Sequence, residues 1–339
     1  MSYTHKSKIA GVTAALAITA LTLVGCAGSS TDDPAGGPVK GIAFLAGSPD
    51  ATYVVAEREG ITETAKAAGY KVDSFSADYD PARQQSQCDT AISSGKYSGI
   101  IIIPVSGPTA VPCVTQAAAA GIKVASLDVQ VGPKLGATGI QTKGIVAQIY
   151  ADQNTLVAEQ AKLVLKACKD AAKCVIGAVT GDPAYPDQAV ARQAWRDQVA
   201  KHPSLEIAGE VEGGFSNADG GISATQSLLQ TAPEINVIVV DDDETATGVV
   251  AELARQGKSD TVQVIGTGGT AAALERITKG TQFATIAYIP KESAIRVTKM
   301  LLTAIGGGKI ATPSLDLTAV TKDGVAVTRS NVSSFLPGY

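Results

Sequence analysis

The chain has 339 residues, of which 45% are hydrophobic and 18% charged, and its net charge at neutral pH is −4. This composition excludes a disordered chain and allows one large or two medium domains with substantial cores. Basic residues do not cluster, so the sequence predicts no nucleic-acid partner.

The first segment has the layout of an export signal. Two lysines precede an uncharged apolar run that ends just before Cys26, an order typical of a signal peptide. Cys26 resembles the lipidated cysteine of the bacterial lipobox. We therefore expect a lipoprotein signal peptide over residues 1–25, a flexible tether over 26–37, and a lipid anchor on the outer face of the cell membrane. An ordinary signal peptide or a single membrane helix is the alternative.

Strand and helix patterns alternate after the tether. Four consecutive isoleucines at 100–103 are typical of a parallel strand covered on both faces, and Pro104 ends that run. Because ligands bind beyond the carboxyl ends of parallel strands, residues 104–107 and Asp128 are candidate positions for a site. Strands are expected at 39–46, 70–75, 100–103 and 122–127, and helices at 52–68, 81–94 and 112–120.

The pattern starts again after an irregular segment or short strand at 135–140. A long helical pattern is expected at 145–166, and the chain closes with two short strands near Leu315 and Val325. Such alternation predicts two similar α/β halves with parallel sheets and right-handed crossovers. The other strands are expected at 174–179, 205–211, 237–240, 262–265 and 283–288, and the other helices at 186–201, 217–230, 241–255, 271–279 and 290–305.

Four cysteines remain beyond Cys26, and an even count in an exported chain favours two disulfides. Cys168 and Cys174 are close in sequence and are expected to pair, which leaves Cys88 to pair with Cys113. Buried free thiols are the alternative. No histidine stands near these cysteines, so no metal site is expected.

No catalytic motif is recognisable, so we expect neither an enzyme nor a cofactor. His202 is the only histidine after the export signal and lies in a Lys-His-Pro turn, which leaves a Ser-His-Asp arrangement without a base. Residues 266–269 have the wrong spacing for a phosphate-binding loop. The acidic run at 241–244 is explained by the cap and first turn of a helix. A hydrolase that uses this run is an alternative from another functional class.

A family resemblance appears over residues 82–128. This segment has Gln84 and Gln87 on a helix, an apolar strand that ends in proline, an Ala-rich helix, and a strand that ends in Asp128. Together with VIVVDDDETATG, VIGTGGT and ATIAYIP further on, it resembles the ribose-type group of periplasmic-binding-protein-like (type I) receptors, which are sugar-binding proteins of ABC importers. The resemblance implies an α/β fold of two doubly wound parallel-sheet lobes joined by a three-strand hinge. It divides the chain into an N-terminal lobe of residues 38–151 plus 289–316 and a C-terminal lobe of 152–288 plus 317–339.

The resemblance also implies a ligand site between the lobes. In this family, flat aromatic side chains stack on the sugar and charged groups hydrogen-bond its hydroxyls. Each position has a simpler alternative as a cap, a solvated residue or a core residue. The stacking rings are expected at Tyr53 and Phe215, the polar contacts at Asp128, Arg192 and Asp242, and a further ring or hydroxyl at Tyr288; Asp50, Asp182 and Asp187 are weaker candidates, and Trp195 is expected to pack inside its lobe.

Several polar positions of the ribose-type pattern are replaced here. Apolar or small residues stand where that pattern has polar or aromatic ones, at Val54, Val129 and Gly268, and Tyr288 replaces a glutamine. These changes disfavour ribose or glucose and fit a neutral polyol, a less usual sugar or a small hydroxylated signal molecule. One basic site residue against two acids disfavours a strongly anionic ligand.

We therefore predict a monomeric, non-enzymatic substrate-binding lipoprotein of a carbohydrate-type ABC importer. It would close its lobes around one neutral polyhydroxylated ligand and present the closed form to the permease. A receptor for a nucleoside or an autoinducer-like ligand that docks to a sensor protein is the alternative. A transcriptional repressor with the same core is excluded by the export signal and the lack of a helix-turn-helix.

Overall fold

The computed structural model describes residues 40–339, except 49–50, 135, 182, 184, 321–323, 336 and 338. The predicted signal peptide, Cys26, the tether, Asp50 and Asp182 lie outside the described residues. Within the described ranges, no helix is both long and apolar enough to cross a membrane.

The first lobe is built on a six-stranded sheet in the order β11-β5-β4-β3-β1-β2, in which every neighbouring pair is parallel. Its central strands β1 (Gly41–Ala46) and β3 (Gly99–Ile102) are buried along their whole length. Because both faces of these strands are buried, their sequences are continuous runs of apolar residues. The other strands are β2 (Lys71–Ser76), β4 (Lys123–Asp128), β5 (Ile145–Tyr150) and β11 (Ser314–Asp316).

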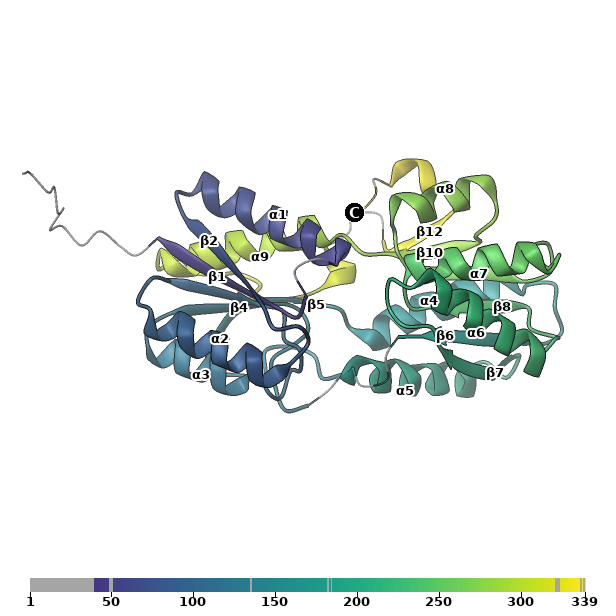
Figure 1. The fold of residues 1–339 in the computed structure, drawn as a ribbon, viewed down its shortest axis with the longest axis horizontal. Helices are drawn as coiled ribbons and strands as arrows, with labels where there is room; N and C mark the ends of the chain where they lie inside the picture. The colour runs from purple at the N-terminus through teal and green to yellow at the C-terminus, as the bar shows by residue number, and fades with distance from the viewer. Residues whose placement is uncertain are drawn as a thin grey trace, which may run out of the picture. The chain divides into compact units, whose positions relative to one another are not determined.

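Helices cover both faces of this sheet (Figure 1). On one face α1 (Thr52–Ala67) packs along α9 (Pro290–Ile305), which returns from late in the chain. Gly60 permits their close approach, because a Cβ atom there would lie 2.6 Å from the carbonyl oxygen of Lys291. On the other face lie α2 (Pro81–Ser93) and α3 (Val111–Ala119).

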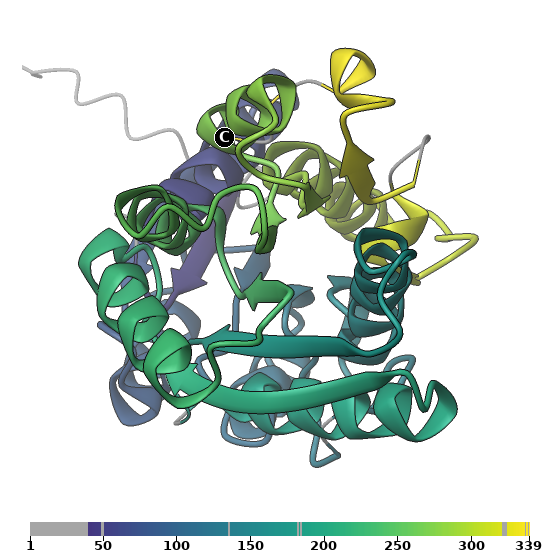
Figure 2. The same cartoon turned by 90° about the vertical axis from the view of Figure 1, so that its right-hand side faces the viewer.

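The second lobe repeats the design with the strand order β12-β10-β9-β8-β6-β7. All its pairs are parallel except that of β12 with β10. Figure 2, seen from the side of this lobe, shows helices on both faces of the sheet. Its strands are β6 (Cys174–Thr180), β7 (Leu205–Glu212), β8 (Val237–Val240), β9 (Gln263–Gly268), β10 (Ala284–Ala287) and β12 (Ala326–Thr328).

The core of the second lobe has a layer on each side of its sheet. Helices α4 (Gln153–Ala167) and α5 (Pro186–Lys201) pack on one side. Helices α6 (Ala218–Thr231) and α7 (Asp243–Arg255) pack on the other. Helix α8 (Ala271–Lys279) lies against β10 and β12.

The chain passes between the two sheets three times. It crosses from β5 to α4, returns from β10 to α9, and crosses again between β11 and β12. Two short 3-10 turns, Leu317–Ala319 and Val332–Ser334, flank the last strand. The predicted fold class, two doubly wound parallel-sheet lobes joined by a three-strand hinge, is confirmed.

The predicted long helix at 145–166 is wrong at its start. Residues Ile145–Tyr150 form β5, which pairs with β4 on one side and β11 on the other. Helix α4 begins only at Gln153, where the Asp152 carboxylate accepts a hydrogen bond from the Asn154 N–H at 3.1 Å. Pairing with the preceding strand β4 and with β11, which is distant in sequence, therefore overrides the helical periodicity of this segment.

The four described cysteines lie in two pairs. Cys88 on α2 meets Cys113 on α3, with Cα atoms 5.8 Å apart. Cys168 at the end of α4 meets Cys174 at the start of β6, with Cα atoms 5.7 Å apart. Both distances lie in the range that a disulfide spans.

Candidate functional site

A cavity of about 300 Å³ lies between the two lobes. Its walls include residues at or just beyond the carboxyl ends of strands in both sheets, the crossings from β5 and β10, and side chains of α4 and α5. Open parallel sheets bind ligands at this edge. The cavity therefore stands where a hinged two-lobe protein would enclose a small molecule.

Asp128 ends β4 in a tight turn. Its φ angle is 61°, and the Val129 N–H donates to the Leu127 carbonyl at 2.7 Å. This left-handed conformation is uncommon for residues other than glycine and tends to occur at functional positions. The turn brings Asp128 to the cavity wall, where the Tyr53 hydroxyl donates to its Oδ1 at 2.7 Å.

Glu57 lies one helical turn after Tyr53 and is completely buried beside Asp128. No donor in the described part of the chain reaches either Glu57 carboxyl oxygen. Burial, reinforced by the Asp128 charge, raises the pKa of Glu57 well above its usual range. Burial also raises the pKa of Asp128 to about 6, although hydrogen bonds from Glu57 and Tyr53 oppose this rise. Burial therefore disfavours the ionised form of Glu57, and the neighbouring Asp128 carboxylate adds to this effect because two like charges disfavour each other's ionisation.

Four consecutive acidic residues follow β8, and three of them line the cavity. Asp241 accepts a hydrogen bond from a backbone N–H of the loop after β6 at 2.8 Å. Asp242 caps α7 by accepting hydrogen bonds from the Thr245 N–H at 2.7 Å and the Thr245 hydroxyl at 2.8 Å. Glu244 accepts a hydrogen bond from the Thr52 hydroxyl at 3.2 Å, a contact that joins the two lobes.

The fourth acid, Asp243, is fully buried away from the cavity. Its carboxylate accepts hydrogen bonds from the Gln282 amide at 3.0 Å, the Thr285 hydroxyl at 2.9 Å and the Gly269 N–H at 2.7 Å. Burial raises the pKa of Asp243, and these hydrogen bonds oppose the rise. Asp243 therefore ties α7 to β9 and β10 and does not face a ligand.

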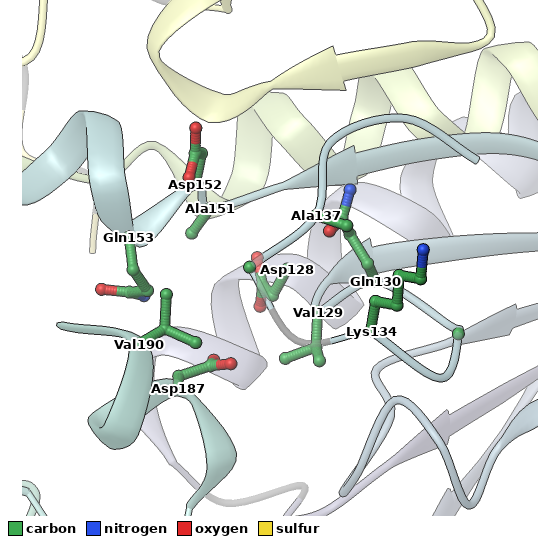
Figure 3. A pocket seen from close by; sticks show the side chains of 12 residues that line it. Asp128, Val129, Gln130, Lys134, Ala137, Ala151, Asp152, Gln153, Asp187 and Val190 are labelled. Carbon is green, nitrogen blue, oxygen red and sulfur yellow. The ribbon is translucent and has the colours of Figure 1, made fainter. Parts of the chain in front are cut away.

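Asp187, in the first turn of α5, brings a further carboxylate to the cavity. Figure 3 shows Asp187 and Asp128 on a smaller pocket that adjoins the cavity, one from each lobe, with Gln153 beside them. Loss of solvent raises the pKa of Asp187 to about 6. The Asp187 charge in turn raises the pKa of Asp128, because two like charges disfavour each other's ionisation.

Aromatic rings form two edge-to-face groups on the cavity wall. Tyr53 packs against Tyr288 and Tyr339, with ring centroids 5.9 Å and 5.5 Å apart. Tyr185 packs against both Phe215 (5.4 Å) and Tyr79 (5.6 Å). Such rings offer apolar faces to a sugar ring or a polyol chain.

Glycine makes room for one of these rings. A Cβ atom at Gly181 would lie 2.0 Å from Cζ of Phe215, so a larger residue there would displace the ring from its present position. Phe215 remains 44% exposed despite this contact, which leaves ring surface free for a ligand.

The structure brings five of the six predicted ligand contacts to one cavity: Tyr53, Asp128, Phe215, Asp242 and Tyr288. Arg192 is not among the residues that line this cavity. It lies on a smaller pocket behind it and forms an ion pair with Glu210 on β7 at 3.0 Å. The expected basic contact to the ligand therefore has no counterpart in this geometry.

Sequence reasoning missed or undervalued several wall residues. Asp187 was a weaker candidate, and Trp195, expected to pack inside its lobe, both packs there and lines the cavity. The rule that ligands bind beyond strand ends would have drawn attention to Asp241, which directly follows β8. No local signal pointed to Tyr339. Among the described residues, no group of His, Cys, Asp or Glu side chains could hold a metal ion.

Known proteins share this sequence pattern and this fold. A D-apiose import binding protein of Actinobacillus succinogenes is 24% identical over 271 residues, covering 78% of this chain and 83% of that protein. A ribose import binding protein of Escherichia coli is 25% identical over 285 residues, covering 83% and 90%.

A solved structure of an ABC transporter solute-binding protein from Bacillus halodurans, with bound myo-inositol, superposes with a TM-score of 0.75. It is 21% identical and covers 89% of this chain and 98% of its own. The sequence profile of the family described as "Periplasmic binding protein domain" matches residues 42–309. This match spans both lobes and all the cavity walls except those near the C-terminus, and the chain therefore belongs to the periplasmic binding protein domain family.

Proposed function

We propose that the protein is the substrate-binding component of an ABC importer for a sugar or polyol. The observation that carries this proposal is the cavity between the lobes, whose walls combine aromatic rings with hydrogen-bonding carboxylates. Hydroxyl groups need strong acceptors, and the apolar faces of a sugar need flat walls. The protein binds its substrate and is not an enzyme.

The relatives support the same ligand class. Their names specify import of D-apiose and of ribose, and the similar solved structure holds myo-inositol. All three are small polyhydroxylated molecules, and none carries a negative charge. An anionic ligand is disfavoured here as well, because it would meet the carboxylates of the cavity.

The ligand contacts that we propose are Tyr53, Asp128, Phe215, Asp242 and Tyr288, joined by Asp187. The three crossings would act as the hinge, and closure would bring the Thr52 side and the Glu244 side of the cavity around the ligand. The closed form would dock on the permease with surfaces of both lobes. The lobe boundaries predicted from the sequence are part of this proposal.

Export and anchoring complete the proposal. Cys26 would carry the lipid, residues 26–37 would act as the tether, and the monomeric binding protein would stand on the outer face of the membrane. Disulfides at Cys88–Cys113 and Cys168–Cys174 suit such an oxidising location. Mass spectrometry of the exported protein tests both the lipid and the disulfides.

A thermal-shift and calorimetric screen of the purified full-length protein tests the function. The panel contains sugars and polyols such as D-ribose, D-allose, D-apiose, xylitol and myo-inositol, with gluconate, adenosine and amino acids for comparison. A ligand at 100 times its dissociation constant adds about 2.7 kcal/mol of stability, which is readily seen as a raised midpoint. Binding confined to nucleosides or amino acids would refute the carbohydrate class.

A pair of variants tests the site. Phe215→Ala removes an exposed wall ring and should weaken binding roughly tenfold while sparing the fold. Ile140→Ala removes a similarly exposed apolar side chain that lies outside the cavity wall and should leave affinity unchanged. Equal affinities of the two variants would refute the site.

A further inference from the structure

The charge of the cavity is one-sided. Five carboxylates line it: Asp128, Asp187, Asp241, Asp242 and Glu244. No lysine or arginine is among the described residues that line this cavity. A site for a neutral sugar needs acceptors, but it does not need this surplus of negative charge.

Two arginines near the cavity are engaged elsewhere. Arg192 approaches Asp241 from behind the cavity wall and is ion-paired with Glu210 at 3.0 Å. Arg276 donates its hydrogen bonds to the Gln282 side chain, the Thr247 hydroxyl and the Asp243 carbonyl oxygen.

Lys134 lines the smaller pocket beside Asp128, but its ammonium group points away from the Asp128 carboxylate (Figure 3). The basic residues near the cavity therefore leave its carboxylates largely uncompensated.

Two of the carboxylates have few hydrogen-bond donors. No hydrogen-bond donor to Asp187 occurs in the described part of the chain, and Asp128 accepts a hydrogen bond from the Tyr53 hydroxyl. Desolvation raises the pKa of both to about 6, which leaves both mainly ionised at pH 7.5. A neutral ligand would displace water from these charges without replacing it by a counter-charge, and burying unpaired charge is costly.

The aromatic rings favour the same ligand charge. The edge-to-face groups around Tyr53 and around Tyr185 line the same cavity as the carboxylates. A cation is attracted to the face of an aromatic ring as well as to a carboxylate. Rings and carboxylates together therefore form a cation-binding environment that also accepts hydroxyl groups.

We propose that the preferred ligand is an amine-bearing sugar or polyol, whose protonated amine is bound by the carboxylates of the cavity while its hydroxyls and apolar faces meet the remaining acceptors and rings. This inference rests on the proposed function as a carbohydrate-binding protein and narrows its ligand class. Asp187 and Asp128, which approach each other from the two lobes, are the carboxylates placed to bind the amine as the lobes close.

Matched ligand sets test the charge separately from the shape. Isothermal titration of the full-length protein at pH 7.5 and low salt compares glucose with glucosamine and N-acetylglucosamine. Galactose is compared with galactosamine and N-acetylgalactosamine in the same way, and a polyol with its 1-amino-1-deoxy analogue. Because charge-assisted hydrogen bonds and cation–π contacts are stronger than neutral ones, the amine should bind roughly tenfold or more tightly than its neutral parent in the set that fits. Its N-acetyl derivative, which is neutral, should lose that advantage.

Variants assign the effect to the cavity. Asp187→Asn keeps the shape and removes one charge, so it should reduce the ratio of amine to neutral affinity by severalfold. Asp260→Asn removes an exposed charge outside the cavity and should leave the ratio unchanged. An unchanged ratio in Asp187→Asn would overturn the role given to this carboxylate.

The outcomes separate this inference from the proposed function. If neutral sugars bind as tightly as their amines or more tightly, the inference is overturned and the carbohydrate function stands. If only amines without hydroxyl groups bind, such as putrescine or cadaverine, both are overturned. Binding of an amino sugar with weak or no binding of its neutral parent supports both.

Discussion

Replacing Asp187 by asparagine should stabilise the ligand-free protein at alkaline pH. Loss of solvent raises the pKa of Asp187 from its ordinary 3.8 to about 6. Because the raised pKa means that the folded protein binds this proton more tightly than the unfolded chain, the proton's stabilising effect is complete below pH 3.8. The effect is lost as the pH rises through about 6.

A pKa rise of this size means that the ionised Asp187 carboxylate lowers the free energy of unfolding by about 3 kcal/mol at pH 8. At pH 4 the loss is less than about 1 kcal/mol. Since the Asp187 side chain keeps some exposure to solvent, we expect Asp187→Asn to gain about 2 kcal/mol over the wild type at pH 8. The same variant should gain almost nothing at pH 4. An asparagine at this position carries no charge at either pH, which is why the gain depends on pH.

Urea unfolding of the wild type and Asp187→Asn at pH 8 and pH 4 measures this difference, and Asp260→Asn serves as the exposed control. Comparison at each pH cancels the titration of all other groups that the two proteins share. A gain of equal size at both pH values, or a loss at pH 8, would show that the Asp187 carboxylate is not destabilised by desolvation.

Three further predictions concern the framework around the cavity. Asp243→Ala leaves the buried Thr285 hydroxyl and Gly269 N–H without an acceptor and should cost about 3 kcal/mol of unfolding free energy in urea. Gly248→Ala places a Cβ atom 1.8 Å from the Ala218 carbonyl oxygen, where α6 meets α7, and should cost roughly 2 kcal/mol or more in the same assay. Removing the Cys88–Cys113 pair, which closes a loop of 25 residues, should cost about 3 kcal/mol, and a reductant should then have a smaller effect on the melting midpoint than it has in the wild type.

Elements with strong local signals were predictable from the sequence. The helix expected at 186–201 has those bounds in the structure, because Pro186 suits only the first turn of a helix. The strand expected at 237–240 is likewise unchanged, since its four β-branched residues are buried on both faces. Strand β5 was missed because its apolar run joins α4 without an intervening glycine or proline, and only its pairing with β4 and β11 makes it a strand.

The candidate site was predictable where it follows the ends of strands. Asp128 ends β4, so the position of a strand end was enough to make it a candidate, whereas Asp242, just beyond β8, was expected from the family resemblance. Arg192 lies within a helix, where successive side chains point in directions about 100° apart and therefore meet different neighbours. Ala191 lines the cavity, whereas Arg192 reaches Glu210. Tyr339 could not be predicted, because its ring reaches Tyr53 from the opposite end of the chain.

The net charge of the cavity depends on residues from several separate segments of the chain. Asp242 has a sufficient role as the cap of α7, Glu244 as a partner of Thr52, and Asp128 as a partner of Tyr53. Only the assembled walls show that these roles add up to a surplus of negative charge. Negative charge held away from water destabilises the ligand-free protein. The same charge favours a cationic ligand, because a protonated amine would supply the missing counter-charge. Asp187→Asn should therefore show a stability gain at pH 8 together with a reduced preference for amines. If the stability gain appeared without the loss of preference, the Asp187 carboxylate would be desolvated but would not contact the ligand.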